Sequence, residues 1–157
     1  MTSYQVETFA KIAQELPPLW VKHWRRLGTE QATVPLSPDV PKYFELDRIG
    51  VLHIVTARSA DGALIGYYFT LIPPTDLHYT GLKRAWTDIY FIDPTAVPPL
   101  SLVAKYRQLI AKVEAELLAL GVQDLRTSVK LHSDIGGLWD RLGYKPVERV
   151  YYRMLGA

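Results

Sequence analysis

The chain has 157 residues, a formal net charge of +2, 48% hydrophobic residues and 22% charged residues. This is the balance of an ordinary globular protein, and we expect a single domain over residues 1–157. The chain has no cysteine, which excludes disulfides and thiolate chemistry. It also has no block of five or more lysines and arginines, so nucleic acid is not an expected partner.

The sequence predicts neither a signal peptide nor a membrane span. The first residues, "MTSYQVETF", lack the basic and apolar regions of a signal peptide. No apolar run approaches the roughly 18 residues that span a bilayer. We therefore expect a cytoplasmic protein with no membrane partner.

The first fifty residues predict a short strand and then helices. "YQVETF" alternates as a strand does, and "AKIAQELPPLWVKHWRRLG" has helical spacing. Pro17 and Pro18 divide that stretch into two helices or kink it. His23 lies on a face of this helical stretch and is interpreted as structural. "TVPLSPDVPKYFELDRIG" predicts a loop and a short helix that ends at Gly50.

Three consecutive strands come next. "VLHIVTAR" and "ALIGYYFTLI" flank a turn with the Asp61-Gly62 pair and predict a hairpin. "AWTDIYFI" predicts a third strand, which Asp93-Pro94 closes. The tyrosine pairs at 67–68 and 151–152 suggest a contact surface, because one of two neighbours in a strand must face away from the core.

The second half predicts a long helix between strands. Apolar residues recur at helical spacing from Leu102 to Leu120, with Ser101 before them and Gly121 after them. "QDLRTSVKL" predicts a strand, "SDIGGLWDRLG" a short helix and "ERVYYRML" a last strand. The later strands need helical crossovers, so part of the sheet is expected to be parallel. The fold class is α/β (α+β), a mixed sheet with helices packed on it.

Three segments in this order carry a resemblance: "ADGALIGYY", "EAELLALGV" and "RLGYKPVE". Together they resemble the GCN5-related N-acetyltransferase family and, more narrowly, the acetyltransferase-like proteins of tailed bacteriophages. The resemblance covers nearly the whole chain. It implies a mostly antiparallel sheet of six to seven strands that splays near its fourth and fifth strands. It also implies acetyl transfer from acetyl-CoA to a small-molecule or protein amine, in the host cytoplasm if the protein is phage-encoded.

The resemblance also implies where acetyl-CoA would lie. The pantetheine arm would pair with the strand residues Ile89, Tyr90, Phe91 and Ile92. The pyrophosphate would lie on the start of the long helix, at Ser101, Leu102, Val103, Ala104 and Lys105. The family's loop carries glycines there, but this chain has none between Asp93 and Leu120, and Pro98 and Pro99 donate no N–H. This loop is therefore interpreted as lost or rebuilt.

Asp88 is the candidate catalytic base. Acyl transfer to an amine needs a base because an ammonium ion is not nucleophilic. The alternative for Asp88 is a strand-end carboxylate that is solvated or paired with Arg84 or Lys83. The family's tyrosine acid is replaced here by Trp139, which has no ionisable proton at useful pH.

Tyr144 is the nearest hydroxyl to that position, although core packing is its other interpretation. His78, Tyr79 and His132 are candidates for the acceptor pocket. The four histidines have no metal-ligand spacing, so no metal site is expected.

Two functions remain open at this point. The first is an N-acetyltransferase with a degenerate pyrophosphate loop. The second is a catalytically inactive protein of the same fold, for example a virion or tail component. The second function predicts that a protein partner or another copy of the chain covers the splay.

Overall fold

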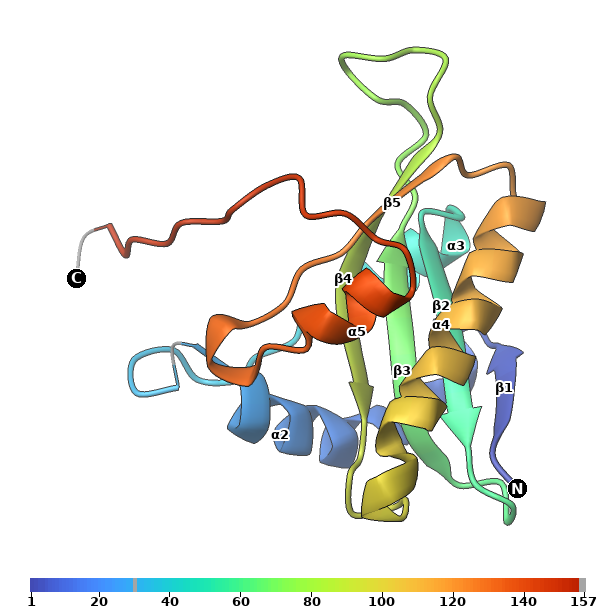
Figure 1. Ribbon diagram of the computed structural model, residues 1–157, viewed down its shortest axis with the longest axis vertical. Helices are drawn as coiled ribbons and strands as arrows, with labels where there is room; N and C mark the ends of the chain where they lie inside the picture. The colour runs from blue at the N-terminus through green and yellow to red at the C-terminus, as the bar shows by residue number, and fades with distance from the viewer. Residues whose placement is uncertain (30, 156–157) are drawn as a thin grey trace.

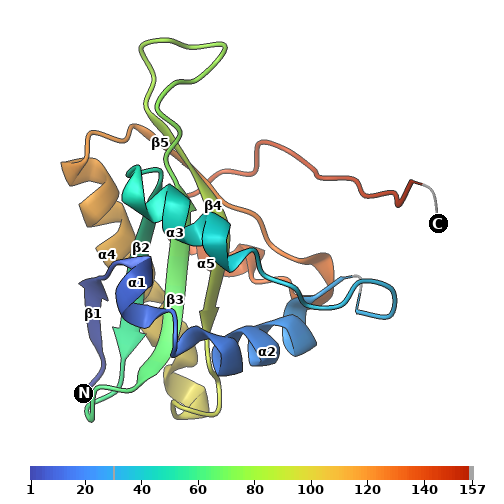
Figure 2. The same ribbon diagram turned by 180° about the vertical axis from the view of Figure 1, so that it is seen from behind.

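A computed structural model describes residues 1–29 and 31–155 as one sheet with helices on both faces (Figures 1 and 2). The strands are β1 (Ser3–Val6), β2 (Leu52–Arg58), β3 (Leu64–Leu71), β4 (Arg84–Ile92) and β5 (Asp124–Arg126). The helices are α1 (Phe9–Ile12), α2 (Leu16–Leu27), α3 (Val40–Arg48), α4 (Leu102–Ala119) and α5 (Gly136–Arg141). Short 3-10 turns form at Pro99–Ser101 and Leu131–Ser133. No helix in the described residues is long and apolar enough to cross a membrane.

The sheet is mixed and mostly antiparallel, as predicted. Its strand order is β1-β2-β3-β4-β5; β1 to β4 pair antiparallel, and β5 is parallel to β4. The parallel pair is possible because α4 crosses over the sheet between them. The described residues form five strands, fewer than the six to seven expected.

The two faces of the sheet are covered by different helices. Helices α4 and α5 lie on the face turned to the viewer in Figure 1, and α1, α2 and α3 lie on the face seen in Figure 2. Tyr67 and Tyr68 point to opposite faces, yet neither is exposed. The suggestion that this pair marks a contact surface is therefore wrong, because helices cover both sides of β3.

Pro17 and Pro18 have the predicted effect. Helix α1 ends at Ile12, and the prolines stand in the first turn of α2, where a missing N–H costs nothing. Lys22 of α2 forms a salt bridge with the buried Asp93, which follows the end of β4. This ion pair fixes α2 beside the second half of β4.

Strands β4 and β5 separate early. Their pairing covers Arg84–Trp86 of β4 and Asp124–Arg126 of β5, whereas β4 continues to Ile92. Within the described chain, residues 87–92 of β4 thus have no strand partner on that edge. On the other edge, Thr70 pairs with Thr87 and Phe69 with Ile89, so Asp88 is the extra residue of a β-bulge.

The predicted last strand over residues 148–155 is wrong. Residues 144–155 form neither helix nor strand, and the last part of this segment extends away from the body of the molecule (Figure 1). The side chains of Val150, Tyr151 and Leu155 are 83–86% exposed. A strand needs a hydrogen-bonded neighbour, and β5, at three residues, offers too short an edge. The strand predicted over residues 123–131 is likewise reduced to β5.

Candidate functional site

A cavity of about 480 Å³ opens beside the unpaired edge of β4. Its walls come from α2, from the segment between α2 and α3, from residues 87–92, from the start of α4 and from the segment that follows β5. The early separation of β4 and β5 leaves the room for it. This volume is in the usual range of small-molecule sites.

Asp88 lies in the cavity wall and has no cationic partner among residues 1–29 and 31–155. Its Oδ2 accepts a hydrogen bond from the hydroxyl of Tyr43 at 2.9 Å. Arg84 instead pairs with Asp76 and Asp124, and the ammonium of Lys83 donates to a backbone carbonyl, so the structural pair considered for Asp88 does not form. The residue is exposed, and its side chain lies in the cavity wall, where the surrounding protein partly desolvates it. This desolvation raises the pKa of the Asp88 carboxyl and outweighs the opposing effect of the Tyr43 hydrogen bond.

The free edge of β4 is partly occupied by a tyrosine. The backbone N–H of Asp93 points to β3, where it donates to the carbonyl of Ile65 at 2.8 Å. Successive N–H groups alternate along a strand, so that of Ile92 faces the cavity edge. It donates to the hydroxyl of Tyr106 at 3.0 Å. The same alternation places the N–H of Tyr90 on the cavity edge.

Hydrogen bonds inside the loop between β4 and α4 use several of the loop's own donors. The carboxylate of Asp93 accepts hydrogen bonds from the Thr95 N–H at 2.9 Å and from the Thr95 hydroxyl at 2.7 Å. The N–H of Ser101 donates to the carbonyl of Pro98 at 2.9 Å. Pro98 and Pro99 have no N–H to offer. The donors that a glycine-rich loop would aim at a phosphate therefore satisfy this chain's own acceptors.

The start of α4 presents mostly neutral side chains to the cavity. Of the five residues 101–105, Leu102 lines the cavity, and Val103 and Ala104 are exposed outside it. The carbonyl of Lys105 accepts a hydrogen bond from Tyr4 at 3.2 Å, on the side of β1. None of the other four, Ser101 and Lys105 included, is among the described lining residues.

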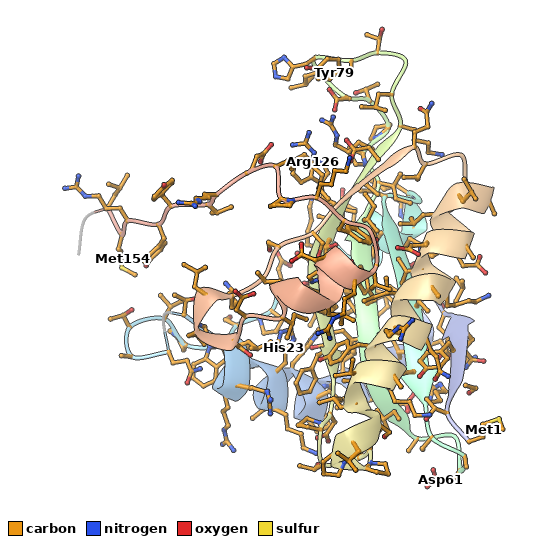
Figure 3. The ribbon with its side chains drawn as sticks, in the orientation of Figure 1. Met1, His23, Asp61, Tyr79, Arg126 and Met154 are labelled. Carbon is orange, nitrogen blue, oxygen red and sulfur yellow. The ribbon has the colours of Figure 1, made fainter. Side chains whose placement is uncertain are left out.

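His23 belongs to this cavity, although the sequence suggested only a structural role. Its Nδ1 lies 2.7 Å from the hydroxyl of Tyr67, and its ring stacks on Phe91 with centroids 5.0 Å apart (Figure 3 labels His23). Burial, with a smaller contribution from Lys130, lowers the pKa of His23 to about 4. The imidazole is therefore neutral at pH 7.

The cavity carries few charges. Among the described lining residues, Asp88 is the single carboxylate, and Arg26 and Lys130 are the cations. Arg26 acts electrostatically on Tyr106, and Lys130 acts on His23. Asp88 is hydrogen-bonded to Tyr43 of α3 instead. Positive charge thus gathers around the start of α4 and the segment after β5, and negative charge lies near α3.

The other predicted site residues lie outside the cavity lining. His78 and Tyr79 belong to the long β3–β4 loop, which projects from the far end of the sheet, where Figure 3 labels Tyr79. Their N–H groups donate to the carboxylate of Asp76. His132 is exposed, although its neighbour Ser133 lines the cavity.

Tyr144 packs in the helix-covered core. Its ring meets Trp139 edge to face, with centroids 4.8 Å apart, and its hydroxyl donates to Glu114 at 2.7 Å. Burial, followed by the contact with Glu114, raises the pKa of Tyr144. Within residues 1–29 and 31–155, no three His, Asp or Glu side chains group as metal ligands would.

Comparison with known proteins finds likeness in structure alone. No protein-family model matches the chain, and no curated protein matches it. A GCN5-related N-acetyltransferase from Ralstonia eutropha JMP134 superposes with a TM-score of 0.75 at 13% identity, over 98% of this chain and 99% of that one. A ribosomal-protein-alanine N-acetyltransferase from Brucella melitensis biovar Abortus 2308 has a TM-score of 0.69 at 15% identity, over 99% and 100%.

A third solved structure carries a ligand. AAC(6')-Iy, solved with the bisubstrate analogue CoA-S-monomethyl-acetylneamine, superposes with a TM-score of 0.65 at 19% identity, over 100% of this chain and 99% of that one. Identities this low establish the fold and leave the reaction open. Together with the mixed sheet and the separation of β4 from β5, they show that this chain has the fold of the GCN5-related N-acetyltransferases.

Proposed function

We propose that the protein transfers an acetyl group from acetyl-CoA to a small-molecule amine, with Asp88 as the general base. One observation carries the proposal: Asp88 projects from a bulge into the wall of the cavity, beside the unpaired edge of β4, and has no cation to neutralise it. A carboxylate with a raised pKa is a better proton acceptor than an ordinary one at neutral pH.

The structural neighbours support this choice of reaction class. One of them was solved with a bisubstrate analogue of CoA, and a predicted acetyltransferase from Clostridium acetobutylicum was solved with acetyl-CoA. Another neighbour was solved with the amine sisomicin. For this chain we infer the same two kinds of ligand, a CoA thioester and an amine.

The residues present fit the acyl end of acetyl-CoA better than its diphosphate. The cavity edge of β4 offers the N–H of Tyr90 to the pantetheine amides, whereas the N–H of Ile92 already has a partner in Tyr106. The loop and the start of α4 offer the diphosphate few free donors. Arg26 and Lys130 are the cations that would hold it instead. We therefore propose that the pyrophosphate loop is degenerate.

The chemistry asks little of the chain beyond proton transfer and alignment. When bound, acetyl-CoA supplies the acyl group: the amine nitrogen bonds to the acyl carbon as the C–S bond breaks, and the thiolate leaves. Asp88 would take one proton from the incoming ammonium group, and the second proton lost by the nitrogen would go to the departing thiolate, which leaves as the thiol. Tyr43 keeps the carboxylate oriented through its 2.9 Å hydrogen bond.

The first prediction concerns Asp88→Asn. It removes the base and keeps an oxygen that can accept from Tyr43, so we expect acetyl transfer to fall by about 100-fold or more. Transfer is measured as thiol release from acetyl-CoA across a panel of primary amines. The melting temperature should not fall, because the raised pKa of Asp88 means that folding disfavours its ionised form.

Asp140→Asn is the matched control. Asp140 is exposed on α5, and its side chain has no partner in the described residues. Its rate should equal that of the wild type. An Asp88→Asn rate equal to wild type would exclude Asp88 as the base.

The hydrogen bonds of Tyr106 and of the loop between β4 and α4 favour a second candidate function. It is a protein of this fold without transferase activity, such as a virion or tail component. The bond from Ile92 to Tyr106 and the internal bonds of the loop occupy donors that acetyl-CoA would use. Calorimetric titration with acetyl-CoA separates the two candidates. Micromolar binding supports the enzyme, whereas no heat at millimolar ligand supports the inactive protein.

A further inference from the structure

The acceptor end of the cavity is built around one negative charge. Asp88 is the single carboxylate among the described lining residues, and Tyr43 donates to only one of its oxygens. Its other oxygen accepts no hydrogen bond from the described residues. Such a carboxylate matches one ammonium group, through a charge-assisted hydrogen bond.

The remaining charge in the cavity is positive. Arg26 and Lys130 lie on the side of Tyr106 and His23, and the imidazole of His23 adds no negative charge. A ligand with several ammonium groups would place the second and third of them in the field of these two cations. The charge distribution therefore disfavours polycations.

The surface next to Asp88 is aromatic and apolar. The ring of Tyr43 lies 5.8 Å from that of Trp20, measured between centroids, so an aromatic wall continues from the carboxylate into α2. Trp24, Val34 and Leu36 extend this wall. Hydroxyl groups buried against it would lose their hydrogen bonds to water without replacement, whereas a hydrocarbon body gains from the burial.

From these three observations we propose that the acceptor is a small monoamine carried on an aromatic or branched apolar body, with its ammonium group on Asp88. The cavity of about 480 Å³ must also admit the acyl end of acetyl-CoA, which leaves room for one ring rather than a chain of sugars. This inference rests on the proposed function. It goes further than the proposed function because it names the class of amine, which differs from the sisomicin found in one structural neighbour.

The test is calorimetric binding of three compounds to the whole protein without acetyl-CoA. 2-Phenylethylamine has one ammonium group on an aromatic body, 2-phenylethanol lacks the charge, and sisomicin is a polycation. We expect 2-phenylethylamine to bind at least tenfold more tightly than either of the others. Asp88→Asn should weaken its binding at least tenfold, and Asp140→Asn should leave its affinity unchanged.

One double variant tests the positively charged end of the cavity. Arg26→Gln combined with Lys130→Gln removes both cations and should raise the affinity for sisomicin severalfold, with little effect on 2-phenylethylamine. A merely structural role of these side chains would instead weaken the binding of both amines.

The outcomes separate the inference from the proposed function. Binding of sisomicin as tight as that of 2-phenylethylamine, no binding of either amine, or equal amine binding by Asp88→Asn and wild type would overturn the inference. Asp88-dependent binding of 2-phenylethylamine with no acetyl transfer would keep the monoamine site and remove the transferase. Acetyl transfer that favours sisomicin would keep the transferase and remove the monoamine site.

Discussion

At the scale of single residues, Tyr106 decides how open the edge of β4 is. Its hydroxyl accepts the N–H of Ile92, one of the donors that face the cavity. Tyr106 also lines the cavity, as does Leu102 of the same helix. The same side chain therefore fills space in the cavity and takes a backbone donor near the start of α4.

Tyr106→Phe is predicted to raise the affinity for acetyl-CoA. The substitution keeps the ring and frees the N–H of Ile92 for a ligand. It should also lower the free energy of unfolding of the ligand-free protein by about 1 kcal/mol, because that N–H loses its partner. Calorimetric titration and thermal unfolding measure the two effects.

Tyr4→Phe is the control for this variant. Tyr4 also bonds α4 through its hydroxyl, at the carbonyl of Lys105, but it lies outside the cavity lining. Its loss should not change the affinity for acetyl-CoA. If Tyr106→Phe weakens binding instead, the hydroxyl contacts the ligand itself, and the idea that it blocks a donor fails.

The sequence predicted Asp88 as a polar group of the site but did not predict His23 or Tyr43 there. Asp88 stands out because a carboxylate interrupts an apolar strand. His23 lies on the apolar side of a helix, where a cavity wall and a packed core give the same periodicity. Tyr43 meets Asp88 only through the packing of α3 near β4, a contact 45 residues apart in sequence that no local pattern contains.

At the scale of elements, β3 and β4 hold the cavity wall in place. Gly66 of β3 pairs with Ile92 of β4, at the end of the edge that faces the cavity. A Cβ at Gly66 would lie 2.7 Å from the backbone oxygen of Phe91 and 2.9 Å from a side-chain carbon of Ile92. The strands approach as closely as they do because position 66 has no side chain.

Gly66→Ala is predicted to destabilise the protein by roughly 1–3 kcal/mol, the usual cost of overpacking a core. Urea unfolding measures the loss. Gly137→Ala is the comparison, because a Cβ at Gly137 meets nothing within 4 Å and alanine favours its helix, α5. Equal stabilities of the two variants would show that β3 and β4 can move apart without cost.

The elements that the sequence predicted well are those with local signals. The Asp61-Gly62 turn, the prolines before α2 and the apolar stripe of α4 depend on neighbouring residues alone. The last strand was wrong because "ERVYYRML" has β propensity but no adjoining edge long enough to pair with. β propensity measures how well a residue fits a sheet, so it predicts a strand wrongly where the sheet has no free edge long enough to pair with.

At the scale of the whole molecule, a buried ion-pair cluster joins the N-terminal segment to the sheet. Glu7, which is 5% exposed, pairs with Arg58 of β2 and with Lys11 of α1, each at 2.7 Å, and accepts from the hydroxyl of Thr56. Arg58 also reaches Glu15 at 2.8 Å. Burial raises the pKa of Glu7, but the bonds from Arg58, Lys11 and Thr56 outweigh it and lower the pKa to about 2.

This cluster predicts a specific loss of stability in acid. A carboxyl whose pKa is lower in the folded state stabilises the fold above its ordinary pKa of 4.5, and this contribution is lost as the pH falls from 4.5 towards 2. Glu7→Gln should lower the free energy of unfolding at pH 7 by about 3 kcal/mol, because it leaves Arg58 partly unpaired. It should also flatten the acid limb of a plot of stability against pH.

Glu148→Gln provides the comparison for Glu7. Glu148 pairs with Arg126 near the surface, and its side chain is 58% exposed, so its loss should change stability by less than about 1 kcal/mol. Unfolding by urea between pH 2 and pH 7 gives both curves. Parallel acid limbs for Glu7→Gln and the wild type would assign the acid sensitivity to other carboxylates.

The bulge at Asp88 has a consequence for the phase of β4. Ala85 faces the core under α4, but two odd-numbered residues beyond the bulge, Ile89 and Phe91, face the core under α2, and Tyr90 takes the α4 side. One inserted residue thus exchanges the two faces of the strand midway along it. Deleting Asp88 would do more than remove a carboxylate: it would turn Phe91 away from His23, so the proposed base and the core packing depend on the same one-residue insertion.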